Sequence, residues 1–399
     1  MTALEPRTGA RQSSLRASNL ALVARTVCAS ARPLSRADVA ALTSMTRTTA
    51  TRLADELVAG GVLAEIEPDG GGRRGRPATP LVPGGRLAAL GLQVNAGFLA
   101  VRVVDLRGRA VAESLEHTDL VGSDPAATLQ RLGELSARVL GGLPGELRLV
   151  GAGLALPGIV AAATGTLLRA PNLGWSDVCP AQLLAPDAVA GLPLRVGNEA
   201  NLAARTVAEA APGRPGAFPD FVYLSGEIGI GGAAVLAGDV MAGRHGWAGE
   251  IGHVCVDPAG PACRCGSTGC LETYAGRDAL LAAAGLTPAS TTAHLAELAA
   301  SGEDRARGAL AGAARALAVA LAGVVNVLDI PTVVLGGHLA QVADLVRPDL
   351  EAGLRARVLS ARWTPPAIHA ATPTPAAGAT GAAYRELSTV LEDPARWLA

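Results

Sequence analysis

The sequence has few cysteines, little net charge and no long uninterrupted apolar run, and each shortage excludes a class of protein. The first residues, "MTALEPRTGARQSSLRASN", contain no continuous apolar stretch of the kind that a signal peptide needs. No run reaches the roughly 18 to 20 uncharged apolar residues of a membrane span. A net charge of -1 argues against a protein that is basic all over. We therefore expect a cytoplasmic protein with reduced thiols and no membrane partner.

Length and charge together predict more than one domain. The chain has 399 residues, 49% of them apolar, which is enough for two or three domains with cores of their own. Residues 1–85 hold 11 arginines against 7 acidic residues and so carry +4, and the net charge of -1 then leaves -5 on the remainder. The N-terminal segment is therefore the candidate for an anionic partner.

Four of the six cysteines lie in one stretch, "HVCVDPAGPACRCGSTGCLE", residues 253–272. In a reducing compartment, clustered thiols bind metal more often than they form disulfides. Glycines at 266 and 269 allow a tight knuckle around one ion, which predicts a structural zinc site. The candidate ligands are His253, Cys263, Cys265 and Cys270. Because His253 and Cys255 would share one face of an extended strand, either could be the fourth ligand; inert thiols in a glycine-rich loop are the alternative.

Residues 19–63 have the pattern of three short helices. Apolar residues first recur at helical spacing. The second helix should begin after Ser35, with Asp38 at the capping-box position. The third should begin after Thr46 and end at the glycines 60–61. The short turn between the second and third helices predicts a helix-turn-helix.

The third predicted helix has one apolar and one polar face. Its polar residues, which we expect to contact DNA, are Arg47, Thr48, Thr51 and Arg52. The next segment, residues 62–83, predicts a two-stranded wing with a glycine- and arginine-rich tip. The tip residues expected to enter a minor groove are Arg73, Arg74 and Arg76. A protein-interaction module with a solvated arginine linker is the alternative, but helices, wing, tip and positive charge together favour DNA.

From about residue 88 the sequence alternates apolar strands with Ala- and Leu-rich helices. Residues 87–118 predict a strand meander, which a helix and a buried strand follow. A second round of strand, helix, glycine-broken hairpin, helix and strand runs to about residue 340. This pattern predicts two α/β lobes that share a cleft. The Pro- and Ala-rich stretch "TPTPAAGATG", residues 372–381, predicts a loop before a last helix.

The segment "AGEIGHVCVDPAGPACRCGSTGCLETYAG" resembles the signature of the ROK family, which contains sugar kinases and sugar-responsive repressors. "GLALPGIV", "APNLGW" and "VGNEANLAA" match further family segments in order. Residues 11–85 resemble the DNA-binding domain of the repressor branch. The resemblance implies an N-terminal all-α/winged helix-turn-helix domain followed by a two-lobed α/β domain, sugar-kinase-like and of the actin-like ATPase type.

The expected domains follow from this resemblance. Residues 1–85 would form the DNA-binding domain with its basic wing and linker, and residues 86–399 the ROK sugar-binding domain. The smaller lobe would cover about 88–199 plus the C-terminal helix. The larger lobe would cover about 200–375 and contain the zinc knuckle.

The resemblance also implies roles for individual residues. The family's zinc ligands correspond to His253, Cys263, Cys265 and Cys270, which favours His253 over Cys255. The family's sugar contacts correspond to Asn198, Glu199, Glu250, His253 and Glu272. These types suit a sugar, because carboxylates and amides exchange several hydrogen bonds with a ring of hydroxyls. Zinc would hold the loop of Glu272 and, through His253, the turn of Glu250, and would do no chemistry itself.

The phosphate loops of the family's kinases are altered here. An Asp-x-Gly-Gly-Thr loop corresponds to "QVNAG", with Gln93 in place of the Asp. A Gly-Thr-Gly-Ile-Gly loop corresponds to "EIGIG", in which Glu227 and Ile228 replace Gly and Thr. A carboxylate beside a triphosphate opposes its binding. Glu199 stands at the position of the kinase base but is one methylene longer. We expect no ATP as cofactor, no catalytic residue and no kinase activity.

These expectations combine into a DNA-binding transcriptional regulator, a repressor, whose affinity for its operator a sugar controls. A homodimer or homotetramer would read a two-fold symmetric double-stranded operator. The alternative is an active ATP-dependent sugar kinase fused to a DNA-binding domain. A third reading, in which the cysteine knuckle binds nucleic acid, is disfavoured because the knuckle has one arginine and no aromatic residue.

Overall fold

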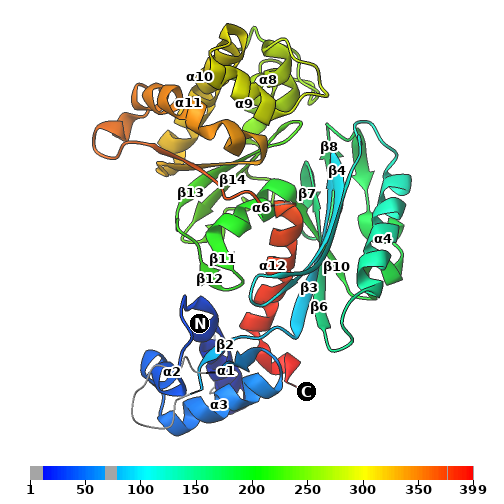
Figure 1. The fold of residues 1–399 in the computed structure, drawn as a ribbon, viewed down its shortest axis with the longest axis vertical. Helices are drawn as coiled ribbons and strands as arrows, with labels where there is room; N and C mark the ends of the chain where they lie inside the picture. The colour runs from blue at the N-terminus through cyan, green and yellow to red at the C-terminus, as the bar shows by residue number, and fades with distance from the viewer. Residues whose placement is uncertain (1–11, 68–78, 375, 399) are drawn as a thin grey trace, which may run out of the picture.

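The computed structural model describes residues 12–67, 79–374 and 376–398. Figure 1 shows three tiers: a helical module at one end, a lobe built on one sheet in the middle, and a second lobe capped by helices at the other end. The module contains the helices α1 (Gln12–Ala29), α2 (Arg36–Thr43) and α3 (Arg47–Ala59), and the antiparallel strands β1 (Leu63–Glu65) and β2 (Leu81–Pro83).

The ends of α2 and α3 are set by local side chains, as predicted. Ser35 accepts from the backbone N–H of Asp38, whose carboxylate accepts from the backbone of Ser35, which forms a complete capping box. Thr46 accepts from the backbone N–H of Thr49. Gly60 is the C-cap of α3. The two-stranded wing is present, and its expected tip with Arg73, Arg74 and Arg76 lies outside the described residues.

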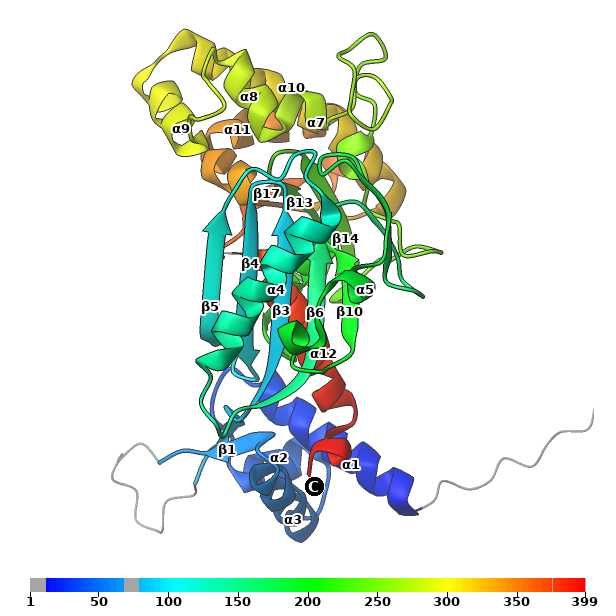
Figure 2. The ribbon, with the colours of Figure 1, turned by 90° about the vertical axis from the view of Figure 1, so that its right-hand side faces the viewer.

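The first lobe is built on a five-stranded sheet in the order β10-β6-β3-β4-β5. Strands β3, β4 and β5 form the predicted antiparallel meander. Strand β6 then pairs parallel with β3, and β10 pairs parallel with β6, so both are reached by crossover connections. Helix α4 lies over one face of this sheet, and α12 lies over the other (Figure 2). The elements are β3 (Leu87–Asn95), β4 (Phe98–Asp105), β5 (Ala110–His117), α4 (Pro125–Gly141), β6 (Arg148–Leu156) and β10 (Leu194–Asn198).

A small antiparallel sheet, which the sequence pattern does not predict, is inserted between β6 and β10. Its order is β7-β8-β9. Its elements and the short helices that follow are β7 (Ile159–Ala161), β8 (Thr166–Ala170), β9 (Trp175–Val178), α5 (Pro180–Leu183) and η1 (Pro186–Val189).

The second lobe repeats the strand order of the first. Its sheet runs β15-β14-β13-β16-β17, with antiparallel pairing of β13 to β14 and parallel pairing of β13 to β16. The two hairpins, β3–β4 and β13–β14, are therefore equivalent parts of a duplicated scaffold. The strands are β13 (Phe221–Gly226), β14 (Ile230–Leu236), β15 (Asp239–Val240), β16 (Thr332–Gly336) and β17 (Ala367–Ala370), and β11 (Glu209–Ala211) and β12 (Arg214–Pro215) precede them.

Helices cap the second lobe and share its core. They are η2 (Ile251–His253), α7 (Glu272–Ala275), α8 (Arg277–Ala283), α9 (Thr292–Ser301), α10 (Asp304–Leu328), α11 (Gly337–Arg355) and η3 (Leu359–Arg362). By length and composition α10 could cross a membrane, but 61% of its most apolar window is buried inside the protein. Its apolar face packs against α8, α9 and α11, which explains its hydropathy as that of a core helix.

Two helices lie between the sheets: α6 (Glu199–Ala208) and α12 (Ala377–Glu392), which η4 (Pro394–Trp397) follows. Helix α12 begins inside the stretch for which we predict a loop, and that prediction is wrong for residues 377–381. Two glycines at its start lower helix propensity. They are required because a Cβ at Gly381 would collide with the carbonyl of Leu202 on α6, and one at Gly378 would lie 2.8 Å from the Gln93 side chain.

Candidate functional site

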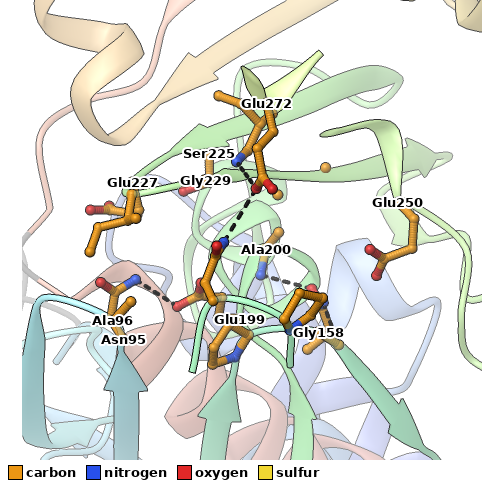
Figure 3. Close-up of a pocket in the computed structure, with 18 of the residues that line it drawn as sticks. Asn95, Ala96, Gly158, Glu199, Ala200, Ser225, Glu227, Gly229, Glu250 and Glu272 are labelled. Carbon is orange, nitrogen blue, oxygen red and sulfur yellow. Dashed lines mark hydrogen bonds between the residues drawn. The ribbon is translucent and has the colours of Figure 1, made fainter. Parts of the chain in front are cut away.

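A cleft opens between the two lobes at the ends of both hairpins (Figure 3). About 610 Å³ of space that protein atoms do not fill lies in this cleft, part of it open to solvent. All five predicted sugar contacts line it. They are Asn198, Glu199, Glu250, His253 and Glu272. Asn95 and Glu227 line it as well, and its described lining residues include four glutamates and neither arginine nor lysine.

Glu199, the first residue of α6, is held by two amides of the first lobe. Gln93 Nε2 donates to Glu199 Oε2 over 3.1 Å, and Asn95 Nδ2 donates to the same oxygen over 3.0 Å. Burial raises the pKa of Glu199, while these two hydrogen bonds oppose the rise. Within the described part of the chain Oε1 accepts no hydrogen bond, so it is available to a ligand.

Asn198 has a structural task besides lining the cleft. Its Oδ1 accepts from the backbone N–H groups of Ala200 and Asn201 over 2.9 and 3.0 Å, so it is the N-cap of α6. Its Nδ2 donates to the carbonyl of Gly158 over 2.9 Å. An amide has two N–H donors, so one remains for a ligand.

Glu227 lies in the turn of the β13–β14 hairpin, at the same end of the cleft as Asn95 and away from Glu250 (Figure 3). Burial and the neighbouring charge of Glu199 raise the pKa of Glu227 to about 8, against the opposing charge of Arg277. Near neutral pH this carboxyl therefore holds a proton for much of the time. Glu250 also has a raised pKa, because burial and Glu272 outweigh the charge of His253.

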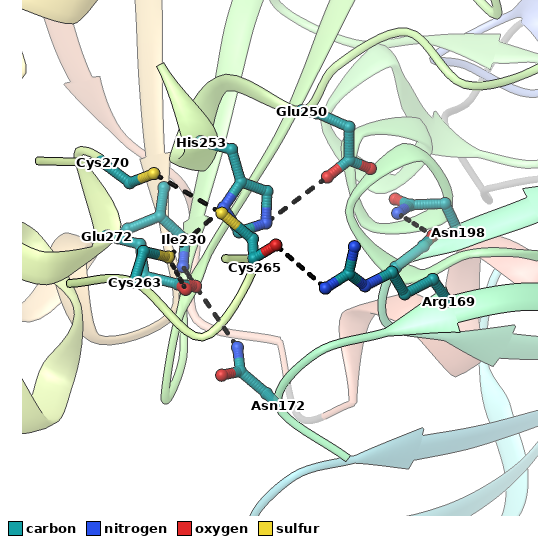
Figure 4. A network of polar contacts seen from close by, with 11 residues as sticks. Arg169, Asn172, Asn198, Ile230, Glu250, His253, Cys263, Cys265, Cys270 and Glu272 are labelled. Carbon is teal, nitrogen blue, oxygen red and sulfur yellow. Dashed lines mark hydrogen bonds and ion pairs between the residues drawn. The ribbon is translucent and has the colours of Figure 1, made fainter. Parts of the chain in front are cut away.

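The four predicted zinc ligands converge beside the cleft (Figure 4). Their ligand atoms all lie within 4.8 Å of one another: His253, Cys263, Cys265 and Cys270. Two sulfurs bound to one tetrahedral zinc at 2.3 Å would lie about 3.8 Å apart. The Sγ atoms of Cys265 and Cys270 are 3.7 Å apart, and Cys263 Sγ is 3.8 Å from His253 Nδ1. Cys255 is exposed and lies outside the group, so the donor set fits Cys3His with His253 as the fourth ligand.

The knuckle reaches two cleft carboxylates directly. His253 Nε2, the ring nitrogen away from the thiols, lies 3.8 Å from Glu250 Oε2. Cys263 Sγ is 3.4 Å from Glu272 Oε1, and Glu272 Oε2 accepts from the backbone N–H of Ile230 over 3.3 Å. A side chain at Gly229 would collide with that oxygen, which explains the glycine in this turn.

Contacts that sequence reasoning missed tie the knuckle to the first lobe (Figure 4). Arg169, on β8, donates to the carbonyl of Cys265 over 2.9 Å. Asn172 Nδ2 donates to Glu272 Oε2 over 3.3 Å, and Arg264 donates to Asn172 Oδ1 over 3.3 Å. Asn172 belongs to the stretch "APNLGW", so the family motif carried a signal for it. Arg169 and the inserted sheet had none.

The residues predicted to contact DNA share one solvent-facing side of α3, and they are Arg47, Thr48, Thr51 and Arg52. Toward the C-terminus of α3 the same side carries acidic residues. Glu56 pairs with Arg52 over 2.7 Å and also with Arg16 of α1. Arg36 bridges Asp55 on α3 and Glu65 on β1. The positive half of this face is therefore its N-terminal half, the part of a recognition helix that meets base edges.

Comparison with known proteins agrees with this architecture. The sequence model of the ROK family matches residues 115–386, more than half of the chain. The chain belongs to the ROK family. Within it, the DNA-binding transcriptional repressor Mlc of Escherichia coli is 27% identical over 343 residues, 82% of this chain and 83% of Mlc.

Two solved ROK structures have a fold similar to that of this chain. A ROK family transcriptional regulator, a homologue of the E. coli MLC protein, superposes with a TM-score of 0.72 and 23% identity over 95% of this chain and 99% of that chain. A ROK family glucokinase from Streptomyces griseus, solved with glucose and AMPPNP, gives a TM-score of 0.62 and 27% identity over 74% and 98%. The predicted two-lobed, sugar-kinase-like fold is thus confirmed, and the regulator matches nearly the whole chain.

Proposed function

We propose that this ROK protein is a DNA-binding transcriptional repressor whose operator affinity is set by a sugar bound in the cleft between its lobes. The observation that carries the proposal is the cleft lining. Side chains suited to sugar hydroxyls gather beside the knuckle, and Glu227 lies in the turn that the family resemblance equates with a phosphate loop of the kinases. The likeness to Mlc over most of both chains supports the same function.

The N-terminal module would supply DNA binding. We propose residues 1–85 as the DNA-binding domain and residues 86–399 as the sugar-binding domain. The proposed base and phosphate contacts are Arg47, Thr48, Thr51 and Arg52 of α3, with Arg73, Arg74 and Arg76 of the wing in the minor groove. A homodimer or homotetramer in the cytoplasm would present two copies of α3 to a symmetric operator.

The effector we propose is an unphosphorylated, uncharged sugar. Four glutamates line the cleft, and its described lining holds no arginine or lysine to balance a phosphate. Carboxylates can instead accept from hydroxyls, and Asn198 can donate one N–H. The S. griseus glucokinase, whose structure contains glucose, supports a neutral hexose as the first ligand to test.

The metal we propose for the knuckle is structural Zn²⁺. His253, Cys263, Cys265 and Cys270 would hold it in a closed tetrahedral site, and it would supply no chemistry. Its effect would be positional, because His253 faces Glu250 and Cys263 faces Glu272.

An active sugar kinase is the second candidate, because the glucokinase shares the sugar-binding part of the fold. Against it, Glu199 is held by Gln93 and Asn95, which stand in the first phosphate loop, and Glu227 occupies the second. A sugar-dependent ADP-release assay separates the two. We expect no turnover; turnover that Glu199→Gln abolishes would establish a kinase.

The direct test is a titration of operator DNA in the presence of single monosaccharides. Double-stranded DNA selected in vitro by the zinc-loaded protein serves as the operator. We expect at least one unphosphorylated sugar to change the operator Kd at least about fivefold, the low end of typical couplings. An unaltered Kd with every sugar would remove the sensor function, and no selectable DNA would remove the repressor function.

A further inference from the structure

Gln93 joins the cleft to α12 through one buried amide. Its side chain lies at the end of β3 and is 5% exposed. Its Nε2 donates to Glu199 Oε2 over 3.1 Å. Its Oε1 accepts from the backbone N–H of Ala379 over 3.0 Å. The two bonds point to different elements, so the amide of Gln93 links a proposed sugar ligand to the first turn of α12.

The contact between β3 and α12 around the Gln93 amide is tightly packed. A Cβ at Gly378 would lie 2.8 Å from Gln93 Cδ, and a Cβ at Gly91 would collide with the carbonyl of Ala379. Backbone and side chain therefore touch at this point of the β3–α12 contact. A shift of the Gln93 amide must either displace the start of α12 or break the bond to Ala379.

The far end of α12 lies in the core of the DNA-binding module. Its residues Leu387, Val390 and Leu391 belong to one buried cluster with residues of α1, α2 and α3. Beyond η4, Leu398 touches the end of α3 so closely that a Cβ at Gly60, the C-cap of α3, would collide with it. Figure 1 shows α12 running from between the lobes to this module.

Strand β3 makes a second connection to the same helix end. Arg86, directly before β3, donates through Nη2 to the carbonyls of Ala59 over 2.8 Å and Val58 over 3.3 Å. Gln93 is at the other end of β3. Gln93 belongs to β3 and bonds α12. The segment before β3, through Arg86, and the segment after α12, through Leu398, both contact the C-terminal end of α3, the proposed recognition helix.

From these contacts we infer that Gln93 is the positioning residue that couples sugar binding at Glu199 to the placement of α3. The inference rests on the proposed function and specifies how its two sites communicate. A sugar hydroxyl that binds the available Oε1 of Glu199 pulls on the carboxylate, so the bond from Gln93 Nε2 to Oε2 is strained or lost. The amide can then no longer hold the Ala379 N–H in the same place. A sugar that favours one arrangement of α12 then changes operator affinity, and reciprocity requires DNA to change sugar affinity equally.

Asn95 provides a matched control. It donates to the same oxygen of Glu199 and is 2% exposed, so it is as buried as Gln93. Its Oδ1 accepts from the backbone N–H of Gly97, within its own turn, and makes no bond to α12. Loss of the Asn95 side chain disturbs Glu199 and the turn of Asn95 itself, whereas loss of the Gln93 amide disturbs Glu199 and α12.

The experiment compares the zinc-loaded full chain, Gln93→Leu, Gln93→Glu and Asn95→Ala. The operator Kd is measured with and without saturating D-glucose, or with the panel monosaccharide that shifts the wild type, and sugar Kd is measured by calorimetry. We expect the ratio of operator Kd values to fall to within twofold of 1 in both Gln93 variants, although saturating sugar still binds. Asn95→Ala should weaken sugar binding and keep the ratio within less than about twofold of the wild-type value.

Two outcomes would overturn the inference: a wild-type ratio in the Gln93 variants, or an equal loss of the ratio in Asn95→Ala. Gln93→Glu keeps the acceptor for Ala379 but loses the donor to Glu199, so it decides the matter if Gln93→Leu does not fold. Failure of the wild type to bind DNA or to respond to any sugar is a different result, which refutes the proposed function itself.

Discussion

The side chains on the two sides of the cleft are held in place in different ways. On one side the knuckle holds Glu250 and Glu272 through a metal-type Cys3His cluster. On the other side lie Gln93 and Asn95, near the end of β3, and Glu227, in the turn between β13 and β14; among the described residues no metal-type cluster fixes them. In the proposed function, the knuckle side would recognise the sugar, because its carboxylates are tied to the cluster. The hairpin side would respond to the sugar, because its hydrogen bonds and charge can change.

Removing one thiolate of the knuckle should have the largest effect on zinc content and sugar affinity. In Cys265→Ser we expect zinc content to fall from about one per chain to near zero, because a closed structural site needs four ligands. Sugar affinity should fall about 10- to 100-fold as Glu250 and Glu272 lose their support. Elemental analysis and calorimetry measure both.

Cys255→Ser is the control for that change, since Cys255 is exposed and outside the cluster. It should keep both zinc and sugar. Wild-type sugar affinity in zinc-free Cys265→Ser would show that the knuckle does not support the cleft.

Neutralising Glu199 should weaken the sugar site without touching the knuckle. Glu199→Gln removes a charged acceptor of sugar hydroxyls, a change worth about 1.5 to 3 kcal/mol, or roughly 10- to 150-fold in sugar Kd. Zinc content should stay at the wild-type level. Calorimetry that finds an unchanged sugar Kd would remove Glu199 from the site.

The charge pattern of α3 predicts a graded effect on DNA. Arg47→Ala should weaken operator binding by about 1 to 3 kcal/mol, because Arg47 is exposed at the N-terminal half of the helix. Arg52→Ala should cost less, because Arg52 is already paired with Glu56. Anisotropy titrations of both variants check the order, and a larger loss for Arg52→Ala would reverse our orientation of α3 on DNA.

We expect Glu227 to have a smaller effect, which is on the pH dependence of folding stability. Its pKa is about 8 in the folded protein and near 4.5 when unfolded. Between these values the folded state binds more protons, so this group makes stability fall as pH rises from about 4.5 to 8, by at most about 1.4 kcal/mol per pH unit.

Glu227→Gln should therefore gain stability relative to the wild type as pH rises through this window. Denaturant unfolding at pH 5.5 and 8 measures the gain. A stability difference between variant and wild type that does not change with pH would show that the pKa of Glu227 is not raised.

Local signals made the N-terminal module predictable. The capping box of Ser35 and Asp38 and the cap of Thr46 act within three residues, so the sequence alone placed both helix starts. The four knuckle ligands were predicted from the thiol cluster, and the choice of His253 over Cys255 needed the family motif.

Non-local contacts could not be predicted in this way. Gln93 bonds Glu199 and Ala379, which lie 106 and 286 residues further along the chain. The early start of α12 also depends on such contacts, because Gly378 and Gly381 are there for close packing and not for helix propensity. The inserted β7–β9 sheet and Arg169 had no motif to reveal them.

The proposed repressor function is tested by the operator Kd of the zinc-loaded wild type with and without a neutral monosaccharide, with ATP present and ADP release followed in the same samples. We predict a sugar-dependent change in Kd of at least about fivefold and no ADP release. A Kd that no sugar alters, together with sugar-dependent ADP release, would contradict it.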